Sequence, residues 1–274
     1  MTTNLRIPAL TNTLIVLFFV VLAGCSDKPR EQTENINEQV KPAVVARQLK
    51  YTVVRRLAHD TNAFTQGLEV YKGLFLESTG QYGFSGVRRV DINTGKTVKS
   101  TPLPQQYFGE GITQLNGKIY MLTWLNQQGF IFDATTLSQT GTFTYSGEGW
   151  GITNDGRYLY LSNGTGVITV IDPVTWMVIR SITVSIDGMA VSNINELEWI
   201  NGMIWANVWR SDKVLQIDPA NGIVTGVLDL TGILPTNERT TNTDVLNGIA
   251  WDSTSKTIYV TGKNWPAVFE LTVQ

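Results

Sequence analysis

The amino-acid sequence predicts an all-β protein, a five-bladed β-propeller whose N-terminal strand pairs into the last blade and closes the ring. A unit of apolar strand, tight turn and returning strand occurs five times. The units start roughly 40 to 52 residues apart, which is the period of a propeller blade. Residues 50–274 show no sustained helical periodicity. The five units begin near Gln66-Gly67-Leu68, Glu110-Gly111-Ile112, Trp150-Gly151-Ile152, Asn195-Glu196-Leu197 and Asn247-Gly248-Ile249.

The second unit shows most clearly how each blade is built. Asn116-Gly117 is the dipeptide best suited to a type I′ hairpin, because both central residues of that turn need a positive φ. An apolar strand precedes this turn and another follows it. The four strands of this blade are expected at residues 111–115, 118–124, 129–132 and 141–145.

The other units repeat the same pattern of turns. Glycine and asparagine tolerate the left-handed backbone of such turns, and aspartate caps it through its side chain. The first turns of the other blades are Lys72-Gly73, Asp155-Gly156, Asn201-Gly202 and Asp252-Ser253. The second turns begin at Asp91, Asp133, Asp172 and Asp218.

The last unit contains too few strands to form a blade by itself. It ends with a single strand at residues 267–273, whereas an unassigned strand at residues 51–57 precedes the first blade. We expect this N-terminal strand to be the fourth strand of the fifth blade. Such closure pairs both ends of the ring and leaves no open sheet edge between the first and last blades.

The predicted topology brings several aromatic and polar side chains to one face of the ring. In each blade the first strand runs away from this face and the second returns to it. Residues just before the first strand and just after the second therefore meet around the axis, where we expect a concave apolar pocket with a few polar groups. The residues at these positions are Phe64, Gln66, Phe108, Glu110, Trp124, Trp150, Asn163, Asn195, Trp209, Asn247 and Lys263.

Charge and composition exclude a nucleic-acid surface. The net charge is −2 and only 16% of the residues are charged, with no cluster of Lys and Arg. The pairs Arg55-Arg56 and Arg88-Arg89 are expected on solvated strand faces.

The N-terminal segment resembles the leader of an exported bacterial lipoprotein. Residues 14–23 form an apolar run that is too short to span a bilayer, and Leu22-Ala23-Gly24-Cys25 resembles a lipobox. We therefore expect a signal peptide at 1–24, a lipidated Cys25 with a flexible tether at 25–49, and the propeller at 50–274. This predicts a membrane-anchored protein that faces the periplasm or the exterior. The alternative is an ordinary cleaved leader with an incidental cysteine.

The residue inventory restricts the chemistry. His59 is the only histidine and Cys25 the only cysteine, so neither a zinc site of the usual ligands nor a supported Ser-His-Asp triad is expected. We expect no metal and no cofactor, and a surface or loop role for His59.

Glu110 lies between two glycines before a first strand, and crowding by aromatic residues would raise its pKa toward the range useful for proton transfer. Glu77, at the end of a second strand, is a second candidate carboxylate.

Several short motifs follow one another in register from about Tyr51 to the end of the chain. They are Ala63-Phe-Thr-Gln-Gly-Leu68, Leu76-Glu-Ser-Thr-Gly80, Tyr107-Phe-Gly-Glu-Gly111, Asn195-Glu-Leu-Glu198, Trp205-Ala-Asn-Val-Trp209, Leu246-Asn-Gly-Ile-Ala-Trp251 and Val260-Thr-Gly-Lys-Asn-Trp-Pro266. Together these motifs resemble the plant and bacterial type of glutaminyl-peptide cyclotransferase. The resemblance implies a five-bladed propeller that needs no metal and acts on peptides or proteins with an N-terminal glutamine. The glutamine α-amine would attack its own side-chain amide, releasing ammonia and leaving pyroglutamate. We expect a monomer.

The resemblance also implies roles for the residues of the predicted face. Glu110 resembles the general acid-base residue, and Lys263 the lysine that polarises the carbonyl or stabilises the oxyanion. Gln66 and Asn195 resemble partners of the substrate amide. The aromatic wall that holds the glutamyl side chain would consist of Phe64, Phe108, Trp124, Trp150 and Trp209.

Two other functions stay open on the sequence. A calcium-dependent propeller lactonase or sugar hydrolase would need oxygen ligands around the axis, for which Glu196, Asn154 and Asn247 are available. A non-catalytic propeller could bind a peptide or scaffold an envelope complex. Loss of activity in a chelator would favour the first alternative, and full cellular function of a Glu110→Gln protein would favour the second.

Overall fold

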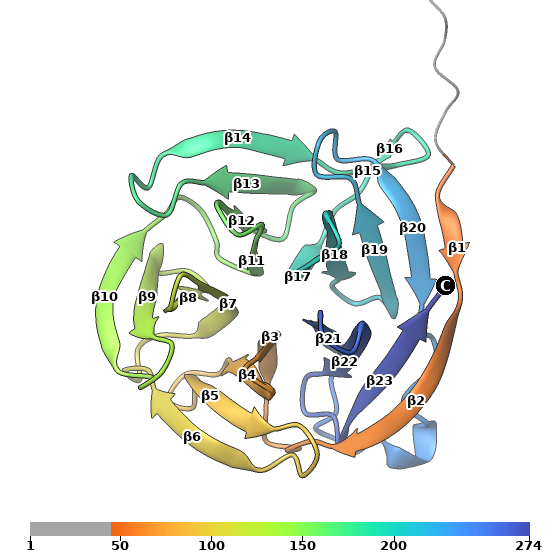
Figure 1. The fold of residues 1–274 in the computed structure, drawn as a ribbon, viewed down its shortest axis with the longest axis horizontal. Helices are drawn as coiled ribbons and strands as arrows, with labels where there is room; N and C mark the ends of the chain where they lie inside the picture. The colour runs from red at the N-terminus through yellow and green to blue at the C-terminus, as the bar shows by residue number, and fades with distance from the viewer. Residues whose placement is uncertain (1–44) are drawn as a thin grey trace, which may run out of the picture. The chain divides into compact units, whose positions relative to one another are not determined.

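The computed structural model describes residues 45–274 and confirms the predicted five-bladed β-propeller. Five antiparallel blades surround a common axis, with consecutive blades side by side around the ring (Figure 1). The residues of the predicted leader, Cys25 and most of the tether lie outside the described part of the chain. No helix within residues 45–274 is both long and apolar enough to cross a membrane.

Four strands, ordered from the axis outward, form each blade, and the fourth blade has a fifth strand at its outer edge. The innermost strands are β3 (Thr65–Tyr71), β7 (Gly109–Leu115), β11 (Ile152–Asn154), β17 (Ile194–Ile200) and β21 (Leu246–Asp252). The second strands are β4 (Leu74–Thr79), β8 (Lys118–Thr123), β12 (Leu159–Leu161), β18 (Met203–Val208) and β22 (Thr257–Gly262). The third strands are β5 (Gly86–Asp91), β9 (Gln128–Asp133), β13 (Val167–Ile171), β19 (Lys213–Ile217) and β23 (Ala267–Val273). The outer strands are β6 (Thr97–Pro102), β10 (Gln139–Thr144), β14 (Val178–Thr183), β20 (Val224–Asp229) and β2 (Tyr51–Ala58).

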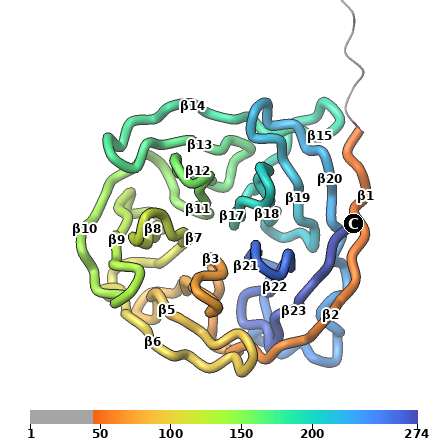
Figure 2. The backbone as a smooth tube through the Cα atoms, in the orientation of Figure 1, coloured from red at the N-terminus to blue at the C-terminus, as the bar shows by residue number. Residues whose placement is uncertain are grey.

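The ring is closed by β2, which pairs antiparallel with β23 in the fifth blade. Tyr51 lies opposite Val273 and Ala58 opposite Ala267. The two strands run beside each other along the outside of the ring (Figure 2). The N-terminal and C-terminal ends of the propeller are therefore held in one sheet, and unfolding of either end would break the ring.

The structure contains a short strand, β1 (Arg47–Leu49), that the sequence analysis did not predict. Residues 45–49 were assigned to the tether, but β1 pairs in parallel with the outer strand β20. This short strand is polar and carries little alternation, so its sequence gives no strand signal, whereas β20 presents an unpaired backbone edge. The remaining elements are the hairpin β15 (Ser185–Ile186) and β16 (Met189–Ala190) and the 3₁₀ turn η1 (Thr236–Glu238).

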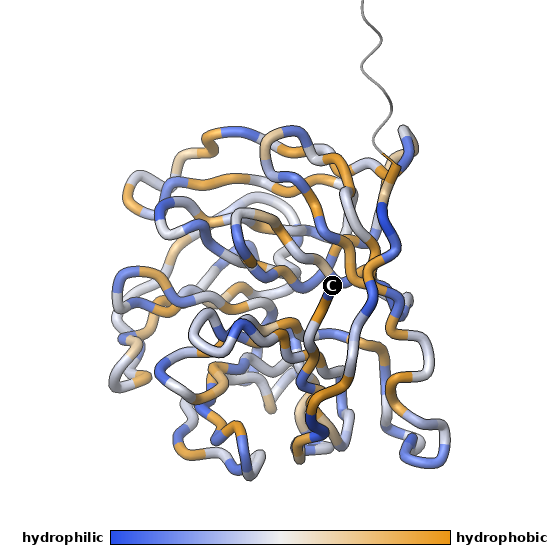
Figure 3. Tube along the Cα trace, turned by 45° about the vertical axis from the view of Figure 1, so that its right-hand side comes forward, coloured by the Kyte–Doolittle hydropathy of each residue, from blue (hydrophilic) through white to orange (hydrophobic). Residues whose placement is uncertain are grey.

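The hydrophobic core consists of five clusters, one between each pair of neighbouring blades. Apolar and polar residues alternate along the strands, so that hydrophobic segments recur throughout the trace (Figure 3). Buried Leu68, Ile112, Ile152, Leu197 and Ile249 occupy the same position of the five innermost strands. A propeller core of this kind depends on the repeat, because each blade buries its faces only against its two neighbours.

The hairpin at Asn116-Gly117 has the conformation that its sequence predicts. Asn116 has a φ of 53° and Gly117 a φ of 77°, as a type I′ turn requires.

The centre of the ring is filled by one glutamate and four glycines at equivalent positions of the innermost strands. A Cβ at Gly111 would lie 2.7 Å from Gly151 Cα, so the strands can approach this closely only without a side chain. The fourth blade has Glu196 at this position instead. Its buried carboxylate accepts hydrogen bonds from the backbone N–H groups of Leu68 and Ile249, at 3.3 and 2.9 Å, and thereby links the fourth blade to the first and fifth.

β-bulges distort four of the five innermost strands next to the axis. The register shifts at Gln66, at Glu110-Gly111, at Asn195-Glu196 and at Asn247-Gly248. A bulge inserts an extra residue and turns its side chain away from the ordinary alternation of the strand. This local irregularity directs polar side chains toward one end of the axis.

Candidate active site

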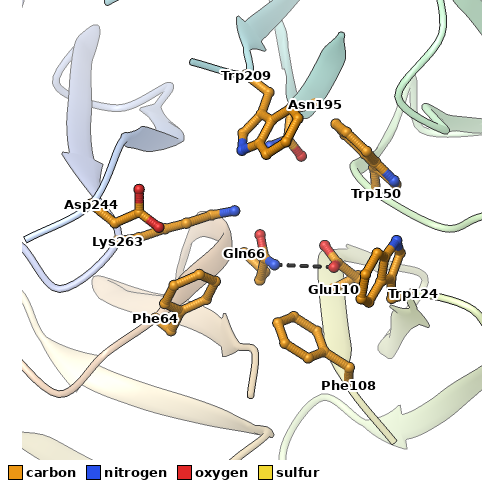
Figure 4. A pocket seen from close by; sticks show the side chains of 10 residues that line it. All are labelled: Phe64, Gln66, Phe108, Glu110, Trp124, Trp150, Asn195, Trp209, Asp244 and Lys263. Carbon is orange, nitrogen blue, oxygen red and sulfur yellow. Dashed lines mark hydrogen bonds between the residues drawn. The ribbon is translucent and has the colours of Figure 1, made fainter. Parts of the chain in front are cut away.

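A cavity of about 260 Å³ lies at the axis, on the face where the innermost strands begin (Figure 4). The structure brings all nine of the predicted catalytic and substrate-binding residues to this cavity, together with Asp244, which the sequence analysis did not name. Each blade contributes at least one side chain. The lining residues are Phe64, Gln66, Phe108, Glu110, Trp124, Trp150, Asn195, Trp209, Asp244 and Lys263.

Glu110 is the buried carboxyl group of the cavity. It is 5% exposed, and its Oε1 accepts a hydrogen bond from the side-chain amide of Gln66 at 3.0 Å (Figure 4). Burial raises the pKa of Glu110 well above its ordinary value; the positive charge of Lys263 opposes this shift and the carboxylate of Glu148 adds to it. Glu110 can therefore hold a proton at a higher pH than an exposed glutamate, as a residue that takes and returns a proton must.

Lys263 brings an amine to the same cavity. It follows β22, and its Nζ lies 4.8 Å from the centre of the Phe64 ring. Burial lowers the pKa of Lys263, while the carboxylates of Glu110 and Asp244 oppose that shift. Burial thus disfavours the charged form of both groups. The negative charge of Glu110 and the positive charge of Lys263 stabilise each other and oppose this effect. The pair places a hydrogen-bond donor and a proton acceptor in one poorly hydrated space.

Two asparagines stand at equivalent bulges of neighbouring blades but have different surroundings. Asn247 is fully buried and donates to the Thr65 carbonyl at 3.0 Å and to Gln66 Oε1 at 3.4 Å, so it supports Gln66 from below. Asn195 lines the cavity, and its buried Oδ1 has no hydrogen-bond partner among residues 45–274. The Oδ1 atom of Asn247 has no partner among these residues either, but only Asn195 lines the cavity, where a ligand can supply the missing donor.

Aromatic rings form most of the remaining wall. Phe108 packs edge-on against Phe64 at 6.1 Å and against Trp124 at 5.8 Å between ring centres. On the other side of the cavity Trp150 meets Trp209 at 5.5 Å, also edge-on. These contacts fix each ring by its neighbour, so the wall is formed before any ligand enters.

One carboxylate outside the cavity holds two of these indoles, and the sequence analysis did not identify it. The Oε2 atom of Glu148 accepts from Trp124 Nε1 at 2.7 Å and from Trp150 Nε1 at 2.8 Å. Glu148 lies in the loop between the second and third blades, two residues before Trp150. Its position next to a wall tryptophan is the only sequence signal that could have identified it.

Glu77 belongs to a separate buried network and not to the cavity lining. Its carboxylate accepts from His59 Nε2 at 3.0 Å, Thr65 Oγ1 at 2.7 Å and Arg88 Nε at 2.9 Å. His59 lies in the loop after β2, as one of its two predicted roles required, but it is not on the surface, since its side chain is 2% exposed. The prediction of a solvated Arg88 is wrong, because its side chain is only 11% exposed. Both side chains leave water because Glu77 supplies the opposite charge, with Asp60 as a second partner of Arg88.

Asn163, which was expected on the same face, lines a neighbouring cavity between the second and third blades and accepts from Thr165.

The residues considered as calcium ligands make hydrogen bonds to other parts of the protein. Glu196 accepts two backbone N–H groups, and Asn154 donates to Thr113 and to the Gln114 carbonyl. Within residues 45–274, no group of three or more His, Cys, Asp or Glu side chains is arranged to hold a metal ion.

The fold and the cavity define a five-bladed propeller with a small axial pocket, in which an aromatic wall surrounds a buried carboxyl group. Comparison with known proteins identifies the family. The glutamine cyclotransferase family model matches residues 18–273, and the chain belongs to this family.

Two relatives support this assignment over most of the chain. The glutaminyl-peptide cyclotransferase of Arabidopsis thaliana is 42% identical over 226 residues, which cover 80% of this chain and 70% of that protein. The crystal structure of Myxococcus xanthus glutaminyl cyclase superposes with a TM-score of 0.78 at 35% identity, covering 84% of this chain and 98% of the other.

Proposed function

We propose that this protein is a glutaminyl-peptide cyclotransferase, which converts the N-terminal glutamine of peptides or proteins to pyroglutamate and releases ammonia. Family membership and the two relatives support the reaction. The observation that carries the assignment to this site is the position of Glu110. It is a desolvated carboxyl group beside the amide of Gln66, in a cavity walled by five aromatic rings.

Closure of glutamine is an intramolecular reaction, so the enzyme must chiefly hold the amine near the amide carbon. The rigid aromatic wall holds the glutamyl side chain in a bent conformation. Gln66 and Asn195 bind the substrate amide, and the unpaired Oδ1 of Asn195 accepts from its N–H group. Since the cavity of about 260 Å³ is smaller than a typical ligand pocket, it suits a single residue.

Glu110 moves the proton that the reaction transfers. As a carboxylate it takes a proton from the substrate α-ammonium, and the freed amine attacks the side-chain amide carbon. The new C–N bond places negative charge on the amide oxygen, which Lys263 stabilises. Glu110 then delivers this proton to the amide nitrogen, the old C–N bond breaks and ammonia leaves. The attacking nitrogen still carries a second proton, which it gives to the freed Glu110 carboxylate; that proton passes on to the departing ammonia or to water, and pyroglutamate keeps one N–H. A carboxyl group with a raised pKa can serve both steps near neutral pH.

The proposed function is tested by incubating the purified full-length protein with a Gln-initiated peptide. We expect release of ammonia and a mass loss of about 17 Da, the mass of the group expelled by the intramolecular closure. The control is an otherwise identical peptide that begins with glutamate, because it has no side-chain amide from which ammonia can leave. A parallel reaction in chelator should proceed at the same rate, and an unchanged mass of the Gln-initiated peptide would refute the assignment.

Glu148 provides a prediction on pH dependence. Glu148→Gln keeps an oxygen that can accept from the two indoles but removes the negative charge that raises the pKa of Glu110. The pKa of Glu110 should fall, so its base form is present at lower pH. The acid limb of the kcat/KM profile should therefore move to lower pH. Glu148→Ala also removes the hydrogen bonds and should raise KM in addition, whereas identical profiles for Glu148→Gln and wild type would contradict the electrostatic role.

We further propose that the protein is exported and anchored to a bacterial envelope membrane through lipid on Cys25, after removal of residues 1–24, and that it is a monomer. The support is the lipobox-like Leu22-Ala23-Gly24-Cys25 after a short apolar run. Cys25→Ser should move the protein from the membrane fraction to the soluble fraction. A variant that stays in the membrane fraction would contradict the anchor, and light scattering of the purified chain checks the monomer.

A further inference from the structure

Three large apolar side chains are exposed on segments that adjoin residues of the cavity wall. Tyr82 is 49%, Phe84 84% and Leu125 52% exposed. We call these three residues the rim shelf. Tyr82 and Phe84 belong to the loop between β4 and β5, and Leu125 directly follows the wall residue Trp124.

The rim shelf is continuous with the aromatic wall of the cavity. Tyr82 packs edge-on against Phe108, with ring centres 5.4 Å apart, and Phe108 in turn packs against Trp124. A Cβ at Gly80, at the start of the loop, would collide with the Phe108 ring. The loop therefore lies directly on the wall, and exposed apolar area that adjoins a binding cavity indicates a contact surface.

Hydrogen bonds hold the loop in one shape. Ser85 Oγ donates to the Gln81 carbonyl at 2.7 Å, and the backbone N–H of Phe84 donates to the same carbonyl at 3.0 Å. The N–H of Gly109, the residue before Glu110, donates to Ser85 Oγ at 2.8 Å. Gln81 has a φ of 89°, a conformation that costs free energy in a residue with a side chain. The loop thus presents its apolar side chains in a fixed position relative to the catalytic strand.

The mouth of the cavity is electrically asymmetric. The segments 80–85, 104–109 and 124–128, around the rim shelf, contain no Asp, Glu, Lys, Arg or His. On the opposite side, Asp244 lines the cavity and the Arg210 guanidinium lies 4.3 Å from the centre of the Trp209 ring. A large apolar group entering the mouth loses no favourable charge interaction with these three segments, and the nearby carboxylate of Glu148 already accepts hydrogen bonds from two indoles.

We propose that the rim shelf binds the side chain of the residue that follows the N-terminal glutamine, and that it favours a large apolar side chain at that position. The inference rests on the proposed function. When the glutaminyl residue fills the cavity, the peptide chain leaves through the mouth, and its second side chain emerges at the rim. There it covers the exposed faces of Tyr82, Phe84 and Leu125 and removes apolar area from water.

The test compares kcat/KM of the full-length protein for the tripeptides Gln-Phe-Ala and Gln-Gly-Ala. Wild type should prefer Gln-Phe-Ala about tenfold, mainly through KM, as expected for partial burial of one aromatic side chain. The double variant Phe84→Ser/Leu125→Ser should reduce this ratio to about twofold or less by the same reasoning. Val174→Ser is the matched control, because Val174 is also 84% exposed but lies on a turn of the third blade; it should keep the wild-type ratio.

The outcomes separate this proposal from the proposed function. If neither tripeptide is cyclised, the proposed function fails. If both are cyclised and wild type shows a ratio near one, only the role of the rim shelf is overturned. A second assay measures sedimentation with phosphatidylcholine–phosphatidylglycerol vesicles, using Cys25→Ser chains with and without the two shelf substitutions. Vesicle binding that depends on the shelf, together with an unchanged peptide ratio, would assign these side chains to lipid and overturn the proposal.

Discussion

Glu110→Gln should reduce kcat for a Gln-initiated peptide by about 10² to 10⁴, the usual contribution of a positioned acid-base residue. Glutamine has nearly the same shape, and its side-chain oxygen can still accept the hydrogen bond from Gln66 that Glu110 accepts at 3.0 Å. It cannot take a proton from the α-ammonium or deliver one to the leaving nitrogen. The substitution therefore removes the proton transfer and leaves the cavity in place.

The measurement must show that Glu110→Gln still binds substrate. Peptide binding can be followed by indole fluorescence, because Trp124, Trp150 and Trp209 line the cavity, and the affinity should change little. Glu69→Gln is the matched control. Glu69 is a partly buried glutamate whose pKa is raised by desolvation to about 7, but it accepts from the Gln114 backbone and lies outside the cavity. Glu69→Gln should retain turnover, whereas persistent turnover in Glu110→Gln would remove the assigned role.

Glu77→Gln should lower the free energy of unfolding by about 3–5 kcal/mol, the cost of leaving a buried charge without its partner. The Glu77 carboxylate faces both Arg88 and His59. The second ring nitrogen of His59, Nδ1, lies 2.8 Å from the Trp265 carbonyl, so both nitrogens face acceptors and the ring carries both protons. Burial disfavours that charged ring, but Glu77 outweighs it and raises the pKa of His59. Without the Glu77 carboxylate, the His59 ring loses its carboxylate partner, and Arg88 keeps only Asp60, whose Oδ2 accepts from Arg88 Nη1 at 2.7 Å.

The same network predicts how stability depends on pH. Burial alone would raise the pKa of Glu77, but the charges of His59 and Arg88 lower it from 4.5 to about 2. Since the pKa of Glu77 is lower in the folded state than its ordinary value, ionised Glu77 stabilises the fold. This contribution to the free energy of unfolding is fully present above pH 4.5 and is lost as the pH falls through 2. Urea unfolding of wild type should show that loss, and Glu77→Gln should lack this component.

A surface pair offers the matched control for Glu77→Gln. Glu238 pairs with Arg56, but their side chains are 30% and 43% exposed. Glu238→Gln should therefore cost less than about 1 kcal/mol, since water and salt screen exposed pairs. The double variant Glu77→Gln/Arg88→Gln should lose less stability than the sum of its single variants, because it removes one of the unmatched charges. A loss below about 1 kcal/mol in Glu77→Gln itself would show that the network does not hold the fold.

The blades and the composition of the cavity could be predicted because both follow from local sequence. The Asn116-Gly117 turn fixes the register of its hairpin through two positive φ angles. Equivalent positions of successive blades then meet at the axis, which is how Glu110, Trp150 and Asn195 could be placed together before the structure was known. The bulges can also be recognised in the sequence, because a polar residue next to a glycine stands at the start of these innermost strands.

The role of Glu77 could not be predicted in the same way. Alternation along β4 placed it at the end of a second strand, near the face of the cavity. Its partners come from separate segments, namely the loop after β2, the start of β3 and the middle of β5. Only their packing shows that the carboxylate turns away from the cavity, and that His59 and Arg88 are buried beside it.

By itself the sequence determined the repeat, the closed ring, the family resemblance and most of the residues around the axis, since these depend on spacing, turn chemistry and strand alternation. The tertiary structure alone decided which charges face one another: Glu110 with Lys263, Glu77 with His59 and Arg88, and Glu148 with two indoles. Electrostatic interactions depend on the distance between side chains and on the water that surrounds them. Both are set by packing between blades that are distant in sequence, and no local pattern records them.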